Sequence, residues 1–121
     1  MNKLEYIPGD LVYIHGSLRI VSNCDGYYAT YYDENESLQE VNVNVIEGIP
    51  ITPEILEKNG WKKPDGFDSY WLDKMGLLQE GDTWHSALGS TKIAITLGNI
   101  LYVHQLQHLL FGLGLNSEME V

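Results

Sequence analysis

The chain has 121 residues, 44% of them hydrophobic, and its 17 acidic and 7 basic residues give a formal net charge of −10. This length fits one compact domain or two small lobes, because domains usually hold about 100 to 150 residues, and the apolar content excludes intrinsic disorder along most of the chain. The surplus of acidic residues argues against nucleic acid as a partner, since non-specific binding to phosphate backbones depends on Lys and Arg.

Residues 1–49 predict an N-terminal lobe made of short antiparallel strands. Segments rich in Val, Ile and Tyr are separated by turn residues, and we expect strands at 11–15, 18–23, 27–33 and 38–45. In the last segment, Val41, Val43 and Val45 alternate with two asparagines, which is typical of a strand with one wet face. Four or five such strands within about 45 residues favour a closed SH3-like β-barrel, because closure removes the exposed edges.

The tyrosines of the third predicted strand are candidates for an interaction surface. Alternation places Tyr27 and Tyr31 on one face and Tyr28 and Tyr32 on the other, so that one pair fills the barrel and the other faces water. We take Tyr27 and Tyr31 as the candidate exposed pair, which could dock a peptide. Ordinary cross-strand packing of aromatic side chains is the alternative interpretation.

Residues 50–121 predict an α+β lobe that forms one compact unit with the barrel. Thr52 suits the N-cap of a short helix at 53–59, Pro53 suits its first turn, and Gly60 suits the position just past its end. Strands at 67–73, 76–79, 83–88 and 92–97 then form an antiparallel meander, followed by a helix at 100–113. We expect the acidic tail at 117–121 to fray.

The last predicted helix carries the chain's metal candidate. Its apolar side chains form one stripe, which we expect to cover the second sheet: Tyr102, Val103, Leu106, Leu109, Leu110 and Leu113. On the far, exposed side, His104 and His108 have the spacing of a zinc-binding helix. The glutamate that acts as base in helical zinc hydrolases is missing, and a third ligand would have to come from His85, His15 or a carboxylate. We therefore expect no metal and no cofactor.

The spacing of the other reactive side chains does not indicate a catalytic site. Gly112 and Gly114 follow a helix instead of opening one, so they predict a helix end and not a phosphate cradle. No serine occurs in the sequence pattern of a nucleophile elbow. We expect the loop carboxylates between residues 65 and 82 to be exposed to solvent. We nominate no catalytic residue.

Three features of the sequence predict the cellular compartment of the protein: Cys24, the N-terminal segment and the hydropathy of the chain. A lone cysteine forms no internal disulfide, which fits a reducing compartment. Residues 1–6 lack the apolar run of a signal peptide, and no segment reaches the roughly 18 apolar residues of a membrane span. We expect a cytoplasmic protein that does not enter the membrane.

Three segments carry a family resemblance: IPGDLV at residues 7–12, IPITPEILEKNGW at 49–61 and ILYVHQLQ at 100–107. Together they resemble a group of small uncharacterised proteins encoded in Bacteroides-type gut bacteria, often within prophages or other mobile elements. The resemblance places His104 and Gln105 in the group's end motif, and His108 where another polar residue is expected. It implies a family and no activity.

These observations favour a non-enzymatic protein-interaction module with a protein partner, whose candidate surface includes Tyr27, Tyr31, His104 and Gln105. Two alternatives stay open. One is a small enzyme or ligand-binding protein with a site between the lobes, around Trp84, His85 and His104. The other is an acidic mimic of nucleic acid, which requires the carboxylates to gather on one face.

Overall fold

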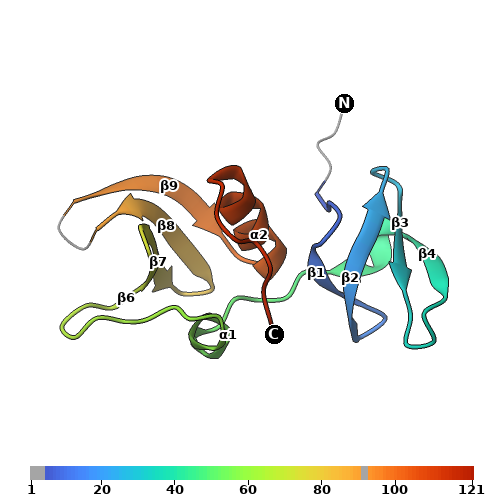
Figure 1. Ribbon diagram of the computed structural model, residues 1–121, viewed down its shortest axis with the longest axis horizontal. Coiled ribbons are helices and arrows are strands. Elements are labelled where there is room, and N and C mark those ends of the chain that lie inside the picture. Colours follow the sequence, from blue (N-terminus) through green and yellow to red (C-terminus); the bar gives the residue numbers. More distant parts are fainter. Residues whose placement is uncertain (1–4, 91–92) are drawn as a thin grey trace. The chain divides into compact units, whose positions relative to one another are not determined.

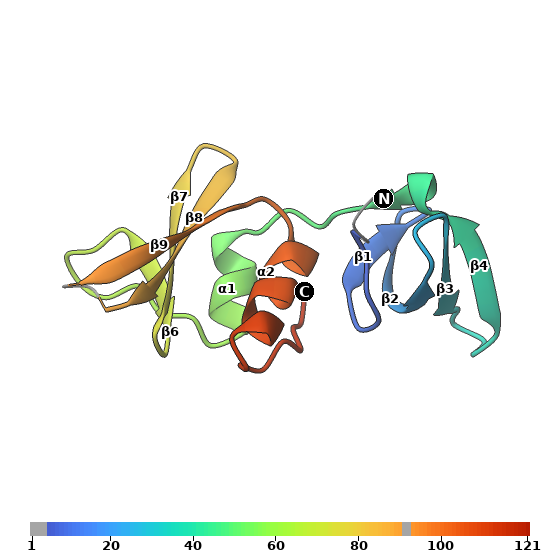
Figure 2. The ribbon, with the colours of Figure 1, turned by 90° about the horizontal axis from the view of Figure 1, so that it is seen from above.

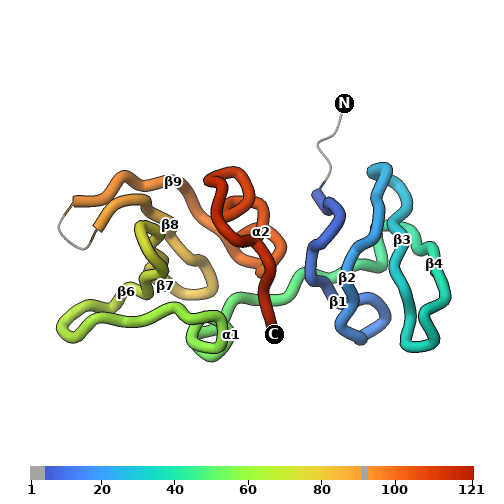
Figure 3. Tube along the Cα trace, viewed as in Figure 1, coloured from blue at the N-terminus to red at the C-terminus, as the bar shows by residue number. Residues whose placement is uncertain are grey.

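The computed structural model describes residues 5–90 and 93–121 and has two antiparallel sheets and two α-helices within that part of the chain (Figure 1). The predicted α+β class is therefore confirmed. The chain divides into two compact units, the first formed by the described residues up to Ile49 together with Val103–Glu118, and the second by Pro50–Tyr102 with Met119–Val121. The chain therefore passes from the first unit to the second and back to the first at Val103. Figure 3 traces the course of the chain.

The first unit is built on a five-stranded sheet with the order β4-β3-β2-β1-β5. Its elements are β1 (Leu11–Ile14), β2 (Ser17–Cys24), β3 (Tyr28–Tyr32), β4 (Leu38–Asn42), the 3₁₀ helix η1 (Val43–Val45) and β5 (Ile46–Glu47). His15 and Gly16 connect β1 to β2, both with positive φ, which is the backbone geometry of a two-residue hairpin turn. The core contains Val12, Ile14, Val21, Ala29 and Tyr31, together with Tyr6 and Ile46.

The sheet is open, so the expected closed barrel is wrong. Among the described residues, β4 and β5 are the two edges of the sheet. The predicted strand at 38–45 stops at Asn42, because the Asn42 side chain accepts a hydrogen bond from the Asn44 N–H at 2.9 Å and caps η1. The chain then turns away after β4, and only the two residues of β5 return to pair with β1.

The second unit contains a four-stranded meander with the order β6-β7-β8-β9, shown as one twisted sheet in Figure 2. The elements are α1 (Pro53–Lys58), β6 (Ser69–Leu72), β7 (Met75–Glu80), β8 (Thr83–Gly89) and β9 (Ala94–Ile100). The prediction of a helix at 53–59 is confirmed to within one residue, and Thr52 caps it by accepting from the Ile55 N–H at 3.2 Å. The strand predicted at 92–97 begins at a position outside the described residues.

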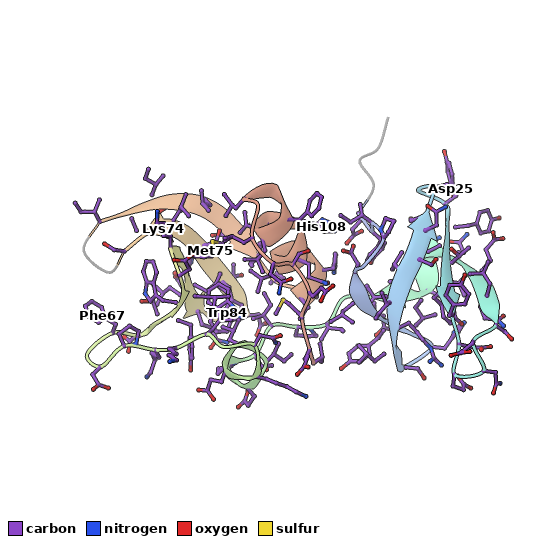
Figure 4. All side chains as sticks on the ribbon, in the orientation of Figure 1. Asp25, Phe67, Lys74, Met75, Trp84 and His108 are labelled. Carbon is purple, nitrogen blue, oxygen red and sulfur yellow. The ribbon has the colours of Figure 1, made fainter. Side chains whose placement is uncertain are left out.

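Aromatic and aliphatic side chains fill the interior of the second unit. Met75, Leu77 and Trp84 are fully buried on β7 and β8, and Figure 4 labels Met75 and Trp84 on these strands. The Trp84 indole N–H donates to the Ile51 carbonyl at 3.1 Å. This bond joins the segment before α1 to the sheet.

The second helix, α2 (Val103–Gly112), groups with the first unit. We expected it to start at residue 100 and to cover the second sheet, but Ile100 ends β9 and Tyr102 forms a β-bridge with Pro50. None of the helices formed by the described residues has the length and apolar character needed to cross a membrane.

The C-terminal tail is hydrogen-bonded, contrary to the expected fraying. The Asn59 side chain pairs with the backbone of Glu120 through bonds of 2.8 Å in each direction. The Lys58 ammonium donates to the Val121 carbonyl at 3.0 Å. Three hydrogen bonds therefore hold the tail at the C-terminal end of α1.

Candidate functional site

Two places in the first unit have the character of a site: a polar cluster where α2 meets the start of β1, and an apolar groove on the outer face of the sheet. Gln107 organises the polar cluster. Its Oε1 accepts from the Leu11 N–H at 2.8 Å, while its Nε2 donates to the Gly9 and Ser117 carbonyls at 3.1 Å each. Its side chain is buried, so these three bonds satisfy an amide that is withdrawn from water.

Sequence reasoning missed Gln107 and could have found it. Gln107 lies four residues after Val103 and three before Leu110, both of which are buried on α2. A polar residue at this helical spacing shares the buried stripe and needs partners there. That position was the available signal.

Asp10 and His108 form the second contact of the cluster. The Asp10 carboxylate is almost fully buried, and its Oδ2 accepts from the Ile7 N–H at 2.9 Å and from His108 Nε2 at 2.7 Å. Burial raises the pKa of Asp10 above its ordinary value, while the Ile7 N–H and His108 counteract the rise. Figure 4 labels His108 on α2. The hydrogen bond between Asp10 and His108 joins α2 to the loop before β1.

His104 is fully buried, and the expectation that it is exposed is therefore wrong. Its ring centroid lies 4.9 Å from that of Tyr6 and 5.8 Å from that of His108, and its Nε2 is 3.6 Å from Glu5 Oε1. Burial lowers the pKa of His104 to about 4, with Asp10 opposing the change, so the imidazole is neutral at neutral pH. A helical-wheel analysis places histidine on the polar side of a helix, so it could not predict the burial of His104.

The metal candidates His104 and His108 are neighbours, but the other proposed ligands lie elsewhere. His15 is in the β1–β2 turn, and His85 on β8 contacts Asn99 Oδ1 at 2.5 Å and Glu80 Oε2 at 2.8 Å. Among residues 5–90 and 93–121, no three His, Cys, Asp or Glu side chains are grouped so that they could hold a metal ion.

A pocket of about 440 Å³ adjoins the polar cluster, lined by Ile7, Pro8, Gly9, Asp10, Gln107, Phe111, Ser117 and Glu118. The side-chain groups of Asp10 and Gln107 in its wall already bond to the protein itself. This arrangement indicates a structural clamp.

The outer face of the first sheet carries an apolar row across three strands. Tyr32 on β3 pairs with Leu38 on β4, and the neighbouring Val21–Tyr31 pair brings Ile20 of β2 next to Tyr32. Ile20, Tyr32 and Leu38 are 59%, 58% and 56% exposed. Beside the row runs an open groove of about 520 Å³, lined by Leu11, Leu18, Arg19, Ile20, Val21, Ser22 and Tyr32. We call this row and groove the outer groove.

The tyrosines separate as alternation predicts, but the expectation for Tyr31 is wrong. Tyr31 pairs with Val21 and is 9% exposed, so it belongs to the core. Tyr28 and Tyr32 are the exposed pair on β3. Tyr27 is exposed but lies in the turn before the strand, and Gln105 is half-buried on α2. Of the four candidate surface residues, only Tyr27 is largely exposed.

Two carboxylates with lowered pKa values adjoin residues of the outer groove, Asp33 next to Tyr32 in the chain and Glu34 beside Arg19. The turn between β3 and β4 contains Asp33, whose pKa is lowered by hydrogen bonds from the Ser37 and Asn35 N–H groups. Glu34 follows, and its pKa is lowered by a hydrogen bond from its own backbone N–H and by the Arg19 guanidinium, which lies 2.7 Å from its carboxylate. Arg19, which lines the groove, is therefore already engaged by Glu34.

The residues proposed for a site between the lobes belong to different units. Trp84 and His85 lie in the second unit and His104 in the first. Trp84 and His104 are fully buried, and both ring nitrogens of His85 contact neighbouring side chains. Each of the three has a structural role within its own unit.

Comparisons with protein-family models, curated proteins and solved structures found no match to this chain.

Proposed function

We propose that this chain is a non-enzymatic protein-interaction module whose outer groove binds a segment of a partner protein with apolar side chains flanked by Lys or Arg. The observation that carries the proposal is the exposed row of Ile20, Tyr32 and Leu38 on neighbouring strands. Large apolar residues exposed singly are normal on a protein surface, whereas a contiguous apolar patch marks a contact site.

The apolar row supplies the free energy of binding in this proposal. Removing apolar surface from water stabilises a complex by about 25 cal/mol per Å², less the entropy lost on association. Tyr32 adds a rigid side chain with a phenol group that can bond at the edge of the contact. The row lies on a sheet whose core residues hold it in place, so little ordering is needed on binding.

Charge defines the chemistry of the partner. The chain has a net charge of −10, the carboxylates of Asp33 and Glu34 are ionised beside the groove, and Glu40 is exposed on β4. Such a surface attracts Lys and Arg and repels phosphate, which raises the association rate for basic segments and disfavours nucleic acid.

The strand order supports a finer proposal, that the first unit is an SH3-like relative. A four-strand meander is followed by a short 3₁₀ turn and a fifth strand that pairs back with β1. Membership of the mobile-element group also stays a proposal, supported by the three sequence segments alone. Cytoplasmic location stays a prediction as well.

Selection of peptides from a random phage-displayed library tests the proposed function. The bait is the wild-type chain, and the selected peptides are then titrated against the Ile20→Asp variant. Phe67→Asp serves as a matched control, because Phe67 is also an exposed apolar residue but lies in the second unit. We expect peptides with apolar positions flanked by Lys or Arg and affinities of roughly micromolar Kd, which fall as salt increases.

The expected pattern is binding at least tenfold weaker for Ile20→Asp and unchanged for Phe67→Asp. Selected peptides that bind both variants as well as the wild type, or a selection that enriches no peptide, would overturn the proposal. Circular dichroism of each variant separates loss of binding from loss of folding.

A further inference from the structure

The edge strand β9 of the second sheet is open, whereas the opposite edge is covered. Within the described part of the chain, β9 pairs with β8 alone. On the other side, Lys62 bridges β6 by donating its N–H to the Trp71 carbonyl at 3.0 Å and accepting from the Trp71 N–H at 2.7 Å. The row of backbone groups along β9 is therefore the place where another strand can join this sheet.

The sequence of β9 lacks two of the features that usually protect such an edge, charged residues and proline. Residues 93–101 contain no charged residue and no proline. Ile93, Ile95 and Leu97 are 80%, 69% and 39% exposed. Natural edge strands commonly carry Lys or Pro to prevent pairing with another chain, so an apolar and uncharged edge predicts a pairing site.

An apolar row of the sheet runs out to this edge. Leu72 pairs with Met75, Met75 with Leu88, and Leu88 with Ile95, so the four side chains share one face. Met75 is fully buried, while Ile95 at the end of the row is largely exposed. A further strand beside β9 would continue the row and cover Ile95.

We propose that a second copy of this chain pairs its β9 antiparallel with β9, with Ile95 opposite Ile95 of the second copy. This register is self-complementary, because a two-fold axis at Ile95 sets Ile93 opposite Leu97 and Leu97 opposite Ile93. The two Ile95 side chains then lie next to each other on the same face of the joined sheets.

The β-bulge in β9 favours a centre at Ile95. Ala87 pairs with Thr96 and Ser86 with Gly98, so Leu97 is the extra residue that interrupts regular pairing. The regular stretch that precedes the bulge has Ile95 near its middle. A register centred on Thr96 would instead set Ile93 opposite the polar Asn99.

The charge of the chain points to the same surface. Two copies of a chain with a net charge of −10 repel each other wherever their acidic residues approach. The segment 93–101 carries no charge, so contact along β9 keeps this repulsion low. This proposal does not depend on the outer groove, which lies in the first unit.

Sedimentation velocity tests the pairing at chain concentrations from about 10 µM to about 1 mM, the range in which small interfaces associate. The wild type is compared with Ile95→Lys and with Phe111→Lys, a matched control because Phe111 and Ile95 are both 69% exposed. We expect a monomer–dimer equilibrium that Ile95→Lys weakens at least tenfold and Phe111→Lys leaves unchanged. A wild type that stays monomeric throughout, or a dimer that Ile95→Lys leaves intact, would overturn the proposal.

A cysteine substitution tests the register. In a Cys24→Ser background, Ile95→Cys should form an intermolecular disulfide on mild oxidation, because side chains opposite each other on paired strands have Cβ atoms about 4.5 to 5.5 Å apart. Phe111→Cys in the same background is the matched control and should stay largely uncrosslinked. Equal crosslinking of the two variants would contradict the Ile95-centred register.

Discussion

Asp10 and His108 lie 98 positions apart in the chain, yet His108 Nε2 donates to Asp10 Oδ2 at 2.7 Å. Gln107, the preceding residue on α2, reaches the backbone on both sides of Asp10, at Gly9 and Leu11. The returning helix is therefore held to the start of β1 by side-chain bonds as well as by packing. Residues 7–12 and 100–107, which lie far apart in the sequence, therefore meet in this clamp.

A double-mutant cycle on Asp10 and His108 should reveal their coupling. Asp10→Ala leaves the Ile7 N–H and His108 without the carboxylate that they bond to, and we expect a loss of about 2–4 kcal/mol in the free energy of unfolding. Once Asp10→Ala is present, His108→Ala should cost less than it does alone, with a coupling of about 1–3 kcal/mol. Urea unfolding of the four proteins measures the cycle, and additive losses would show that the contact carries little energy.

Replacement of Gln107 should destabilise the first unit. Gln107→Ala removes three hydrogen bonds and leaves the Leu11 N–H without this acceptor, so we expect a loss of about 2–4 kcal/mol. Gln79→Ala, at an exposed position on β7, is the control and should change stability by less than about 0.5 kcal/mol. Urea unfolding monitored by circular dichroism compares the two. Equal losses would argue against the clamp.

His104 should make stability depend on pH. Its pKa is about 4 in the folded chain and ordinarily 6.5, so its contribution is fully present above pH 6.5 and is lost as the pH falls from 6.5 towards 4. The loss approaches about 3 kcal/mol over this window, by about 1.4 kcal/mol per pKa unit. Among the described residues, Glu5, Tyr6, Asp10 and His108 are titratable groups near the ring, and Asp10 opposes the shift.

Urea unfolding at pH values across that window measures the effect. His104→Gln removes the titrating group, so its stability should fall less steeply with decreasing pH than that of the wild type. The slope is the readout, because replacing a buried residue also changes stability independently of pH. Parallel curves for the two proteins would contradict the assignment of the pH dependence to His104.

Gly76 on β7 should tolerate no side chain without repacking. A Cβ at this position would lie 2.7 to 2.9 Å from atoms of the Trp71 ring, so Gly76→Ala must displace the indole, and we expect a loss of about 1–3 kcal/mol. Gly112→Ala is the matched control, because a Cβ there meets nothing within 4 Å. Thermal unfolding compares the variants, and restored stability in Gly76→Ala, Trp71→Leu would confirm the clash.

Local signals predicted the elements of the fold well. Thr52, Pro53 and Gly60 marked the short helix because caps depend on the residues beside them. Apolar alternation and turn residues likewise indicated most strands, and the α+β class followed from their order. The ends of the strands were predicted less accurately. The alternation of apolar residues continues to Val45, but β4 ends at Asn42, whose side chain caps the following 3₁₀ helix.

The candidate sites depended on contacts that no local pattern contains. Alternation separated Tyr31 from Tyr32 without indicating which face is covered, and only the pairing of Tyr31 with Val21 decided it. His104 read as a surface residue because its burial against Tyr6 joins the helix to a segment almost a hundred residues earlier. Gln107 differs, because its spacing from Val103 and Leu110 on the helix was a local signal of burial, while its hydrogen-bond partners were not.

The fold class, the helix caps, the alternation along the strands and the acidic charge could all be predicted from the amino-acid sequence, because each depends on composition or on residues a few positions apart. Three features became visible only in the folded chain: α2 belongs to the first unit, its His104 and Gln107 are buried there, and the first sheet is open. Those outcomes come from long-range packing and hydrogen bonding, in which buried polar groups must find partners wherever the chain brings them.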